Sequence, residues 1–499
     1  MGIYKLIKKG AKKEGNFSYK RNNIIFKTNY KEFFKIVDKI AYYLYKKGLK
    51  KGDKLGIYLE NSPEWIAIDL ACFKLGIVVV PLPKKVSKDA INFAIEDSKM
   101  VFIIGDEKIE THVEVLNIEL KGDIRESFNF IEEKEEEKLK EIIKTSDIAT
   151  ICYTSGSTGV PKGVILSHGN IIHNIKNHPL TLSNEDRTVN YLPLAHMFAR
   201  TCDIYFAMEK NVNICFSEGI QKIFENFIEF KPTYFMSVPL LLDKVYKMIT
   251  SEQSIKQLIE NKEFDKIGFI VKQKFGGEIR YIISGGAPLS KEVTDFFFNI
   301  GIPVYQGYGL TETSPLIAVN YKDNNLIGSV GKPIKKIKVK ISKNGTLLVK
   351  SPGLMQGYTK EGEKEKRMIK GWFDTGDVSE INEGFIVING RVDDMILMAN
   401  GKKVYPEFIE KKLEEKGLDQ VIIFGKEKSL VALISSTKSI EDIQNIIDEI
   451  NPNLSSCEQI KKFGLLKKPL SVEEGTLTMS LKKKRSVILS LNKEIIESL

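Results

Sequence analysis

The sequence has no stretch of apolar residues long enough to cross a membrane. A spanning helix needs about 18 to 20 such residues, and the most apolar stretch, residues 66–80, is interrupted by Asp69 and Lys74. This stretch therefore predicts a core helix that leads into a strand. Residues 1–13 carry five lysines but neither the apolar core nor the cleavage site of a signal peptide. We expect a cytoplasmic protein whose association with the inner face of a membrane is at most peripheral.

Cysteine and histidine are scarce, which excludes two further kinds of site. The five cysteines form no Cys-x-x-Cys pair and stand mainly among apolar neighbours, so the pattern favours reduced thiols over a disulfide framework. His168, His173 and His178 are spaced five residues apart, which turns a helix well past one face and does not bring them together as metal ligands. We expect solvent-exposed or capping positions for these histidines.

Charge gives no sign of a nucleic-acid-binding protein. The net charge of +10 comes from 75 Lys and Arg against 65 Asp and Glu, and the lysines are spread over the whole chain. Nucleic-acid binding calls for a concentrated basic stripe or a recognisable module, and the sequence contains neither. A mixed-charge run at residues 132–144 predicts an exposed helix without chemistry.

The order of short apolar runs predicts the fold class. A chain of 499 residues should form two or three domains of roughly 100 to 200 residues each. From about residue 53 to 306, runs rich in Val, Ile and Tyr alternate with helical patterns, which is typical of βαβ units and mostly parallel sheet. The predicted strands are residues 55–59, 78–81, 101–104, 148–153, 188–192, 233–236 and 279–283.

The last third of the sequence has a different pattern. Asn344-Gly345 predicts a hairpin turn between strands at residues 337–341 and 346–349. Beyond Arg391 we predict helices at 405–415 and 440–450 and strands at 420–424 and 430–434. The chain should thus be an α/β protein. Its N-terminal domain, residues 1–392, combines parallel βαβ subdomains with a β-rich subdomain, and a small α+β domain, residues 393–499, follows.

Residues 153–163 read Tyr-Thr-Ser-Gly-Ser-Thr-Gly-Val-Pro-Lys-Gly and have the composition of a phosphate-binding loop. Glycine lets backbone N–H groups approach an anion, hydroxyls add donors, and Lys162 supplies a mobile positive charge. A Walker A loop reads Gly-x-x-x-x-Gly-Lys-Ser/Thr, so this is not a P-loop NTPase. Because a predicted strand precedes it, the loop should lie at the carboxyl end of that strand.

Three later segments also suit a nucleotide. In residues 306–315, Gln-Gly-Tyr-Gly-Leu-Thr-Glu-Thr-Ser-Pro, Tyr308 offers a flat face to an adenine ring, Thr311 a hydroxyl to the α-phosphate, and Glu312 a hard oxygen ligand to Mg²⁺. Asp377, which ends Trp-Phe-Asp-Thr-Gly-Asp, can accept hydrogen bonds from both ribose hydroxyls. Arg391, in Gly-Arg-Val-Asp-Asp-Met-Ile, can donate to ribose or phosphate.

In this fixed order, the four segments resemble the adenylate-forming superfamily of acyl-CoA synthetases, firefly luciferase and peptide-synthetase adenylation domains. The resemblance covers nearly the whole chain, and residues 284–290 and 400–406 look like the bacterial long-chain fatty acid–CoA ligase branch. Residues 477–485, Leu-Thr-Met-Ser-Leu-Lys-Lys-Lys-Arg, resemble the Leu-Thr-Pro-Thr-Leu-Lys-x-Lys-Arg ending of those enzymes. That alignment implies that Lys482 is the adenylation lysine, although the register within three adjacent lysines stays open.

The resemblance also implies a set of site residues. The catalytic residues would be Lys482, Glu312, Thr311 and His196, with Glu312 holding Mg²⁺ and His196 beside the carboxylate-binding channel. The hinge between the two domains would be Asp393. Residues that bind ATP or line the thiol channel would be Thr154, Ser155, Gly156, Ser157, Thr158, Gly159, Lys162, Gly286, Ala287, Pro288, Gln306, Gly307, Tyr308, Gly309, Asp377, Arg391, Asn400 and Gly401.

The reaction implied is ATP-dependent activation of a fatty acid, long-chain by this resemblance, to acyl-AMP with release of pyrophosphate. Transfer to the thiol of coenzyme A would follow. An enzyme that loads acyl carrier protein would use the same adenylation residues, so the acceptor stays open, as do chain length and oligomeric state. A non-catalytic nucleotide sensor would tolerate loss of Lys482, Glu312 or Asp377, and all three are present.

Overall fold

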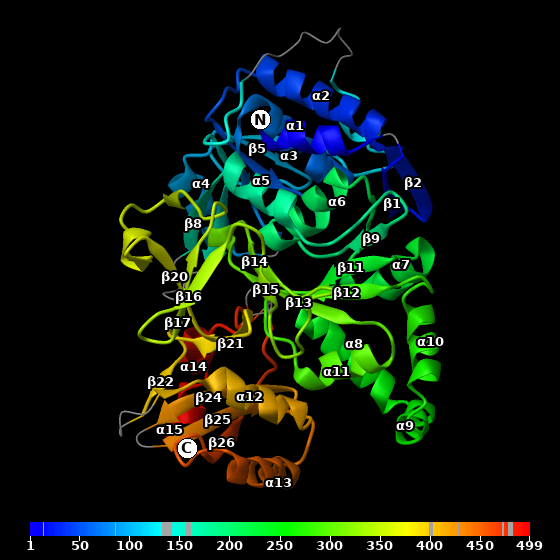
Figure 1. Cartoon of the computed structure of the whole chain (residues 1–499). Coiled ribbons are helices and arrows are strands. Elements are labelled where there is room, and N and C mark those ends of the chain that lie inside the picture. The colour runs from blue at the N-terminus through cyan, green and yellow to red at the C-terminus, as the bar shows by residue number, and fades with distance from the viewer. Residues whose placement is uncertain are drawn as a thin grey trace.

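The computed structural model describes residues 1–12, 14–84, 86–131, 142–155, 161–398, 403–426, 429–471, 474–477 and 483–499. Most of the mixed-charge run at 132–144 lies outside these residues. The N-terminal helices lie at one end of the molecule and the small C-terminal domain at the other (Figure 1). No helix in the described part of the chain is both long and apolar enough to cross a bilayer.

A seven-stranded sheet in the order β18-β8-β7-β4-β3-β5-β6 holds the phosphate-loop segment. Its strands are β3 (Lys54–Tyr58), β4 (Val78–Pro81), β5 (Phe102–Gly105), β6 (Glu114–Asn117), β7 (Ile148–Ser155), β8 (Pro161–Ser167) and β18 (Gly357–Tyr358). Strands β3, β4, β5 and β6 are parallel, as predicted, but β7 and β8 pair antiparallel. The phosphate loop therefore joins two neighbouring strands, which the sequence pattern did not indicate.

Two further sheets complete the large domain's α/β part. One has the order β2-β1-β10-β9 and the other β11-β12-β13-β14-β15. Their strands are β1 (Asn16–Arg21), β2 (Ile24–Asn29), β9 (Arg187–Asn190), β10 (Asn213–Phe216), β11 (Tyr234–Ser237), β12 (Tyr281–Ser284), β13 (Val304–Gly309), β14 (Leu316–Val319) and β15 (Lys332–Pro333). The β1–β2 hairpin was not predicted. It turns at Asn22 and Asn23, which both adopt the positive φ that two-residue hairpin turns require.

The helices of this part cover the sheets (Figure 1). They are α1 (Ile3–Gly10), α2 (Tyr30–Lys46), α3 (Pro63–Leu75), α4 (Lys88–Ser98), α5 (His168–Asn177), the π-helix η2 (Phe198–Tyr205), α6 (Phe206–Glu209), α7 (Ile223–Phe230), α8 (Pro239–Ser251), α9 (Gln253–Glu260), α10 (Phe264–Lys274) and α11 (Lys291–Asn299). Helix α3 leads into β4, as predicted for residues 66–80. Its N-terminus is capped by Ser62, and Pro63 takes the first helical position, where no N–H is needed.

The β-rich subdomain confirms the predicted hairpin. Strands β16 (Lys338–Ile341) and β17 (Thr346–Lys350) pair antiparallel, and Gly345 between them has φ +83°. Strands β19 (Met368–Ile369), β20 (Trp372–Asn382) and β21 (Phe385–Arg391) extend the same sheet.

The C-terminal domain has its own core and matches the predicted elements within two residues. It contains β22 (Ile396–Leu397), β23 (Lys403–Val404), α12 (Pro406–Glu415), β24 (Gln420–Lys426), β25 (Ser429–Ser435), α13 (Ile440–Ile450), β26 (Ile460–Leu465), α14 (Arg485–Leu491) and α15 (Lys493–Ser498). Strand β25 lies between β24 and β26 in a three-stranded sheet. The apolar faces of α12 and α13 pack on one side of it around Leu413, Ile443 and Leu430.

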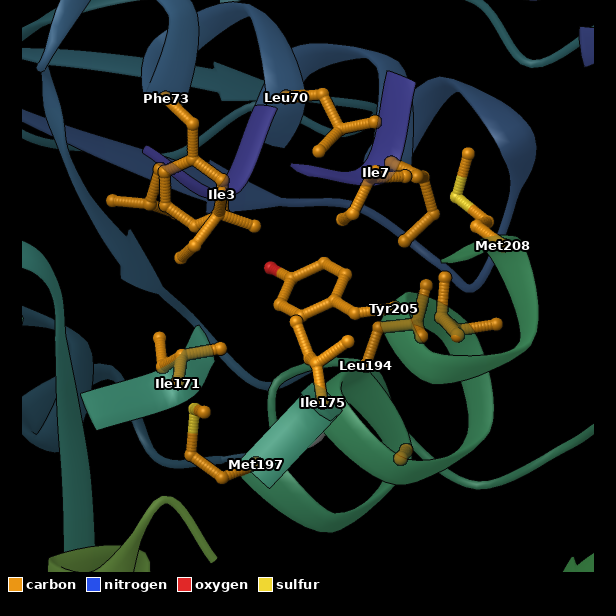
Figure 2. Close-up of a cluster of buried hydrophobic side chains, with 14 of the residues drawn as sticks. Ile3, Ile7, Leu70, Phe73, Ile171, Ile175, Leu194, Met197, Tyr205 and Met208 are labelled. Atoms are coloured by element: carbon orange, nitrogen blue, oxygen red, sulfur yellow. The ribbon is translucent and has the colours of Figure 1, made fainter. Parts of the chain in front are cut away.

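Part of the large domain's core lies where α1, α3, α5 and η2 meet. Figure 2 shows the ring of Tyr205 among Ile3, Ile7 and Ile175. Leu70 and Phe73 of α3 belong to the same cluster and are completely buried. This packing holds η2, the element that follows the predicted His196 segment, against the N-terminal helices.

A buried ion pair crosses this core. The guanidinium of Arg200, on η2, is paired with the carboxylate of Asp69, on α3, and both side chains are fully buried. Arg200 also donates from Nη1 to Thr150 Oγ1, 2.9 Å away on β7, and the Tyr205 hydroxyl joins the group. Burying a charge is costly unless its partner is present, so this pair fixes η2 relative to α3 and β7.

The prediction of solvent-exposed or capping positions was wrong for His173, whereas His168 is buried but accepts from the first N–H of α1 and His178 is the C-cap of α5. His168 is completely buried and its Nδ1 accepts a hydrogen bond from Ile3 N at 3.3 Å, while His173 is 7% exposed. His178 is half-buried and stacks on Phe206 with 4.2 Å between ring centroids. Burial lowers the pKa of His168 and of His173 to about 4. The helix that carries them packs on both sides, which the five-residue spacing alone does not indicate.

Removal of the Asp69 carboxylate from its pair with Arg200 should destabilise the folded protein strongly. Asp69→Ala leaves the Arg200 guanidinium buried without its carboxylate, and we expect the free energy of unfolding to fall by about 3–5 kcal/mol. Glu278→Ala is the control, because its ion pair with Arg187 is exposed and such pairs contribute only about 0–1 kcal/mol. Urea denaturation followed by tryptophan fluorescence measures both. If both variants shifted the urea midpoint equally, the buried pair would contribute no more to stability than the exposed one.

The buried histidines predict weaker folding in acid. In the unfolded chain the His168 ring takes up a proton below about pH 6.5. In the folded protein the same ring stays neutral down to about pH 4. The unfolded state therefore binds more protons between these values, and the free energy of unfolding falls as pH drops through this window. His168→Phe should reduce that slope by up to about 1.4 kcal/mol per pH unit, as measured by urea midpoints at several pH values. An unchanged slope would contradict this assignment.

Candidate active site

The crevice of the site begins where β12 and β13 end. These strands are parallel neighbours, so the loop after β12 and the last residues of β13 meet at one edge of the sheet. The loop carries Gly286, Ala287 and Pro288, which are exposed to the cleft, and β13 carries Gln306. Gln306 Oε1 accepts a hydrogen bond from Leu289 N at 3.3 Å. The two segments predicted to surround adenine are thus joined directly.

Tyr308, Asp377 and Arg391 meet beside this crevice. Asp377 on β20 is the register partner of Arg391 on β21, and Arg391 Nε lies 3.3 Å from Asp377 Oδ1. The Tyr308 hydroxyl donates a hydrogen bond to the other carboxylate oxygen. Burial and the adjacent Asp377 raise the pKa of the Tyr308 phenol, so it keeps its proton. An aromatic face, an acceptor and a cation, the three groups that the sequence predicts for adenosine, therefore lie together.

Glu312 lies on the short helix η4 (Thr311–Thr313), next to groups that no sequence motif indicated. The Tyr358 hydroxyl donates to Glu312 Oε1 at 2.8 Å, and Arg367 Nη1 is 3.6 Å from the same oxygen. Tyr358 lies on the two-residue strand β18 and pairs with Val164 of β8. A two-residue strand has no periodicity of its own, so only the fold reveals this neighbour.

Lys162 already has a carboxylate partner. Its Nζ lies 2.9 Å from Glu363 Oε2 and 5.7 Å from the centroid of the Tyr358 ring. Hydrogen bonds from Lys366 and from Lys162 lower the pKa of Glu363 to about 2. The lysine that the sequence assigns to a polyphosphate is thus held by a side chain 201 positions away. An entering polyphosphate would have to replace that carboxylate.

His196 lies two residues before η2 and lines the same cleft. Apolar side chains also line the cleft, among them Phe198, Val238, Leu316 and Val319. The Tyr191 hydroxyl is within 2.9 Å of Ser237 Oγ. The cleft therefore combines polar and apolar lining.

That space is a cleft of about 3510 Å³ between the two domains. The C-terminal domain contributes Lys483, Lys484 and Arg485 to its lining. The domain also touches the adenine-side loop, because Lys411 Nζ on α12 donates to Leu289 O at 2.7 Å. The Lys411 bond is therefore one point at which the small domain can affect the nucleotide end of the cleft.

Several predicted residues lie outside the described part of the chain. They are Gly156, Ser157, Thr158, Gly159, Asn400, Gly401 and Lys482. Of the remaining ones, Thr154 Oγ1 lies 3.5 Å from Lys162 O, and Ser155 ends β7. Thr311, Gly307 and Gly309 line the cleft, and Asp393 is exposed in the turn after β21.

The donor set suits a metal that phosphates help to hold. Among the described residues there is no group of three or more His, Cys, Asp or Glu placed to bind a metal ion. Glu312 is a single carboxylate with a hydroxyl donor beside it. Mg²⁺ is commonly bound by one or two carboxylates together with substrate phosphates, so Glu312 fits a metal that arrives with a nucleotide.

This fold and cleft define a two-domain nucleotide-binding enzyme. The chain belongs to the AMP-binding enzyme family, whose model matches residues 15–359, and the model of the AMP-binding enzyme C-terminal domain matches residues 393–498. The family assignment agrees with the resemblance found in the sequence, and residues of both matched regions line the cleft.

Similar proteins carry ligase names. The long-chain-fatty-acid–CoA ligase FadD15 of Mycobacterium bovis is 28% identical over 88% of this chain and 87% of its own length. The peroxisomal long chain acyl-CoA synthetase 7 of Arabidopsis thaliana is 29% identical over 88% of this chain and 76% of its own. The solved o-succinylbenzoate coenzyme A synthetase of Bacillus subtilis, in complex with ATP and magnesium ion, has a TM-score of 0.79 at 23% identity. It covers 97% of this chain and 99% of its own, and it shares the fold.

The Lys411 contact predicts how the adenine-side loop responds to the small domain. Lys411→Met removes a charge-assisted hydrogen bond to Leu289 O, worth about 1.5–3 kcal/mol, so amide exchange in residues 285–291 should accelerate by about tenfold or more. Lys412→Met is the matched control, because Lys412 Nζ lies 4.4 Å from the Phe408 ring of its own helix. Hydrogen exchange with mass spectrometry measures both. Equal exchange in the two variants would contradict the interdomain role.

Proposed function

We propose that this protein is an AMP-forming ligase that activates a fatty acid, long-chain in preference, and transfers the acyl group to coenzyme A. The observation that carries the proposal is the meeting of Tyr308, Asp377 and Arg391 in a cleft that is also lined by apolar side chains, among them Phe198 and Val238. A fatty acid needs such an apolar space for its chain and a polar end for its carboxylate. The names of the most similar relatives support this substrate class.

In the first step the carboxylate oxygen attacks the α-phosphorus of ATP, and the bond to pyrophosphate breaks. Tyr308 and the backbone of Gly286 to Pro288 would flank adenine, while Asp377 and Arg391 would hold the ribose. Mg²⁺, held by Glu312, would supply positive charge to the phosphates. Lys482 would bridge the carboxylate and the α-phosphate, so that catalysis rests on positioning and charge neutralisation.

The departing pyrophosphate needs a cationic partner. Lys162 would leave Glu363 for the polyphosphate and return when pyrophosphate departs. Thr154 and Ser155 lie at the end of β7, beside this lysine. The hydroxyls and glycines of residues 156–159 would add donors, as their composition indicates.

In the second step the thiol of coenzyme A loses its proton and attacks the acyl carbon, and AMP leaves. We place the domain boundary between residues 392 and 393 and the hinge at Asp393, which lies in a turn between β21 and β22. Residues at the end of an element can absorb a rotation of this kind. Rotation would withdraw Lys482 and bring Asn400 and Gly401 toward the thiol. His196 would line the carboxylate channel in both steps.

Coenzyme A is the acceptor we favour over acyl carrier protein, since the relatives are named CoA ligases. We also propose a cytoplasmic location, with contact to the inner face of the membrane at most peripheral, where fatty acids partition.

Thiol-dependent release of AMP tests the proposal. Purified protein receives ATP, Mg²⁺ and fatty acids from C2 to C20, with coenzyme A or acyl carrier protein as acceptor. We expect AMP release with long chains and coenzyme A. Release only with carrier protein would change the acceptor, and no release with any acid would refute the proposed activity.

Replacement of Lys482 should affect adenylate formation and thioester formation differently. Lys482→Ala should slow adenylate formation roughly 100- to 1,000-fold, since one charge-stabilising group is lost. Thioester formation from supplied acyl adenylate should change little. Lys461→Ala, an exposed lysine on β26, is the control. Equal losses in both half-reactions of Lys482→Ala would contradict its role in the first step alone.

A further inference from the structure

Two cations on the C-terminal side of position 482 meet one buried glutamate. Glu410 on α12 is 1% exposed. Arg485 forms a two-pronged pair with it, at 2.6 Å from Nη1 to Oε1 and 2.8 Å from Nη2 to Oε2. Lys483 Nζ lies 3.2 Å from Oε2. Glu410 Oε1 also accepts a hydrogen bond from Ile423 N at 2.7 Å, which ties the pair to β24.

Lys483 has no donor left for a substrate. An ammonium group has three N–H donors. Those of Lys483 reach Glu410, Glu414 Oε1 at 2.7 Å and Val421 O at 2.8 Å. All three acceptors belong to the C-terminal domain, so the bonds of Lys483 stabilise that domain. The sequence left open which of three adjacent lysines is the adenylation lysine. Lys483 is the weaker candidate, because its three donors are already bonded.

Opposite charges meet in this cluster, so the buried carboxylate of Glu410 has cationic partners. Burial opposes the charge of Glu410, but Lys483 and Arg485 lower the pKa of its carboxyl below the ordinary value. Glu414 supplies a second negative charge, 2.7 Å from Lys483. Arg485 Nε is 3.4 Å from Asp394 Oδ1, one residue beyond the proposed hinge. A paired, hydrogen-bonded cluster of this kind has one favoured geometry.

The same cluster holds the chain on both sides of residues 478–482. Leu477 and Lys483 form an antiparallel bridge, and Lys484 N donates to Thr476 O at 2.9 Å. Lys483 directly follows Lys482 in the chain. The cluster therefore holds the residue next to the predicted adenylation lysine.

We propose that Glu410 is a positioning residue for the adenylation lysine: it holds Lys483 and Arg485, which follow Lys482 directly in the chain. This inference rests on the proposed function, in which Lys482 acts in the first half-reaction. Lys483 and Arg485 occupy both carboxylate oxygens of Glu410, so its effect on catalysis would pass through these two cations. Its removal should therefore damage adenylation and spare thioester formation, for which Lys482 is not needed.

The test compares Glu410→Gln with Glu449→Gln. Both changes convert the carboxylate of a lysine pair in the C-terminal domain to an amide, but Glu449 pairs with Lys416 at the surface. Fatty-acid-dependent exchange of pyrophosphate into ATP measures adenylation, and thioester yield from supplied acyl adenylate measures the second step. We expect Glu410→Gln to lower exchange by about 10- to 100-fold, the cost of a small misplacement of a catalytic group. Glu449→Gln should match the unmodified enzyme in both assays.

A second variant keeps the test decisive if Glu410→Gln fails to fold. Lys483→Met leaves the Arg485–Glu410 pair in place and removes the other link, so exchange should again fall while the second step is spared. The variant that combines Glu410→Gln and Lys483→Met should lose no more exchange activity than the two single losses predict together, because both residues act through one cluster.

Each contrary result is informative. Equal losses in both half-reactions, or unchanged exchange in Lys483→Met and Glu410→Gln, would overturn the positioning role while the unmodified enzyme still shows exchange. Absence of exchange in the unmodified enzyme with every acid tested would refute the proposed function, and the positioning role with it. The unmodified enzyme thus separates the two failures.

Discussion

The pairing of Asp377 with Arg391 is the constraint on which the site depends. Strands β20 and β21 place these residues opposite each other, and β21 ends at Arg391. The chain then enters the C-terminal domain within a few residues. One register therefore sets both the position of an acidic group in the cleft and the point from which the small domain extends. A slip by one residue would turn both side chains to the opposite face of the sheet.

A second theme is that the cations of the cleft have carboxylate partners in this structure. Lys162 pairs with Glu363, Arg391 with Asp377, and Lys483 with Glu410. The partners differ in burial, and this difference separates their roles. Glu410 is buried, so its pair is retained as a structural unit. Lys162 and Glu363 lie at the edge of the cleft, where an anionic substrate can exchange for the carboxylate.

Much of the fold could be predicted because its signals are local. The strands at residues 55–59 and 78–81, the hairpin at Asn344-Gly345 and the helices of the C-terminal domain follow from periodicity and turn residues. The antiparallel pairing of β7 with β8 and the β1–β2 hairpin were missed, since pairing partners are set by packing. The buried state of His168 was missed for the same reason: α1 covers it, and Ile3 N donates to its ring.

The sequence by itself determined the class of site, because the residues that suit phosphate, adenine and ribose stand in short motifs whose order is legible in one dimension. Only the tertiary structure decided which charges meet. Glu363 is 201 positions from Lys162, and Glu410 is 73 positions from Lys483. No local pattern links such residues, since their proximity results from how sheets and helices pack. The assignment of Lys483 to the interior of its domain therefore required the fold.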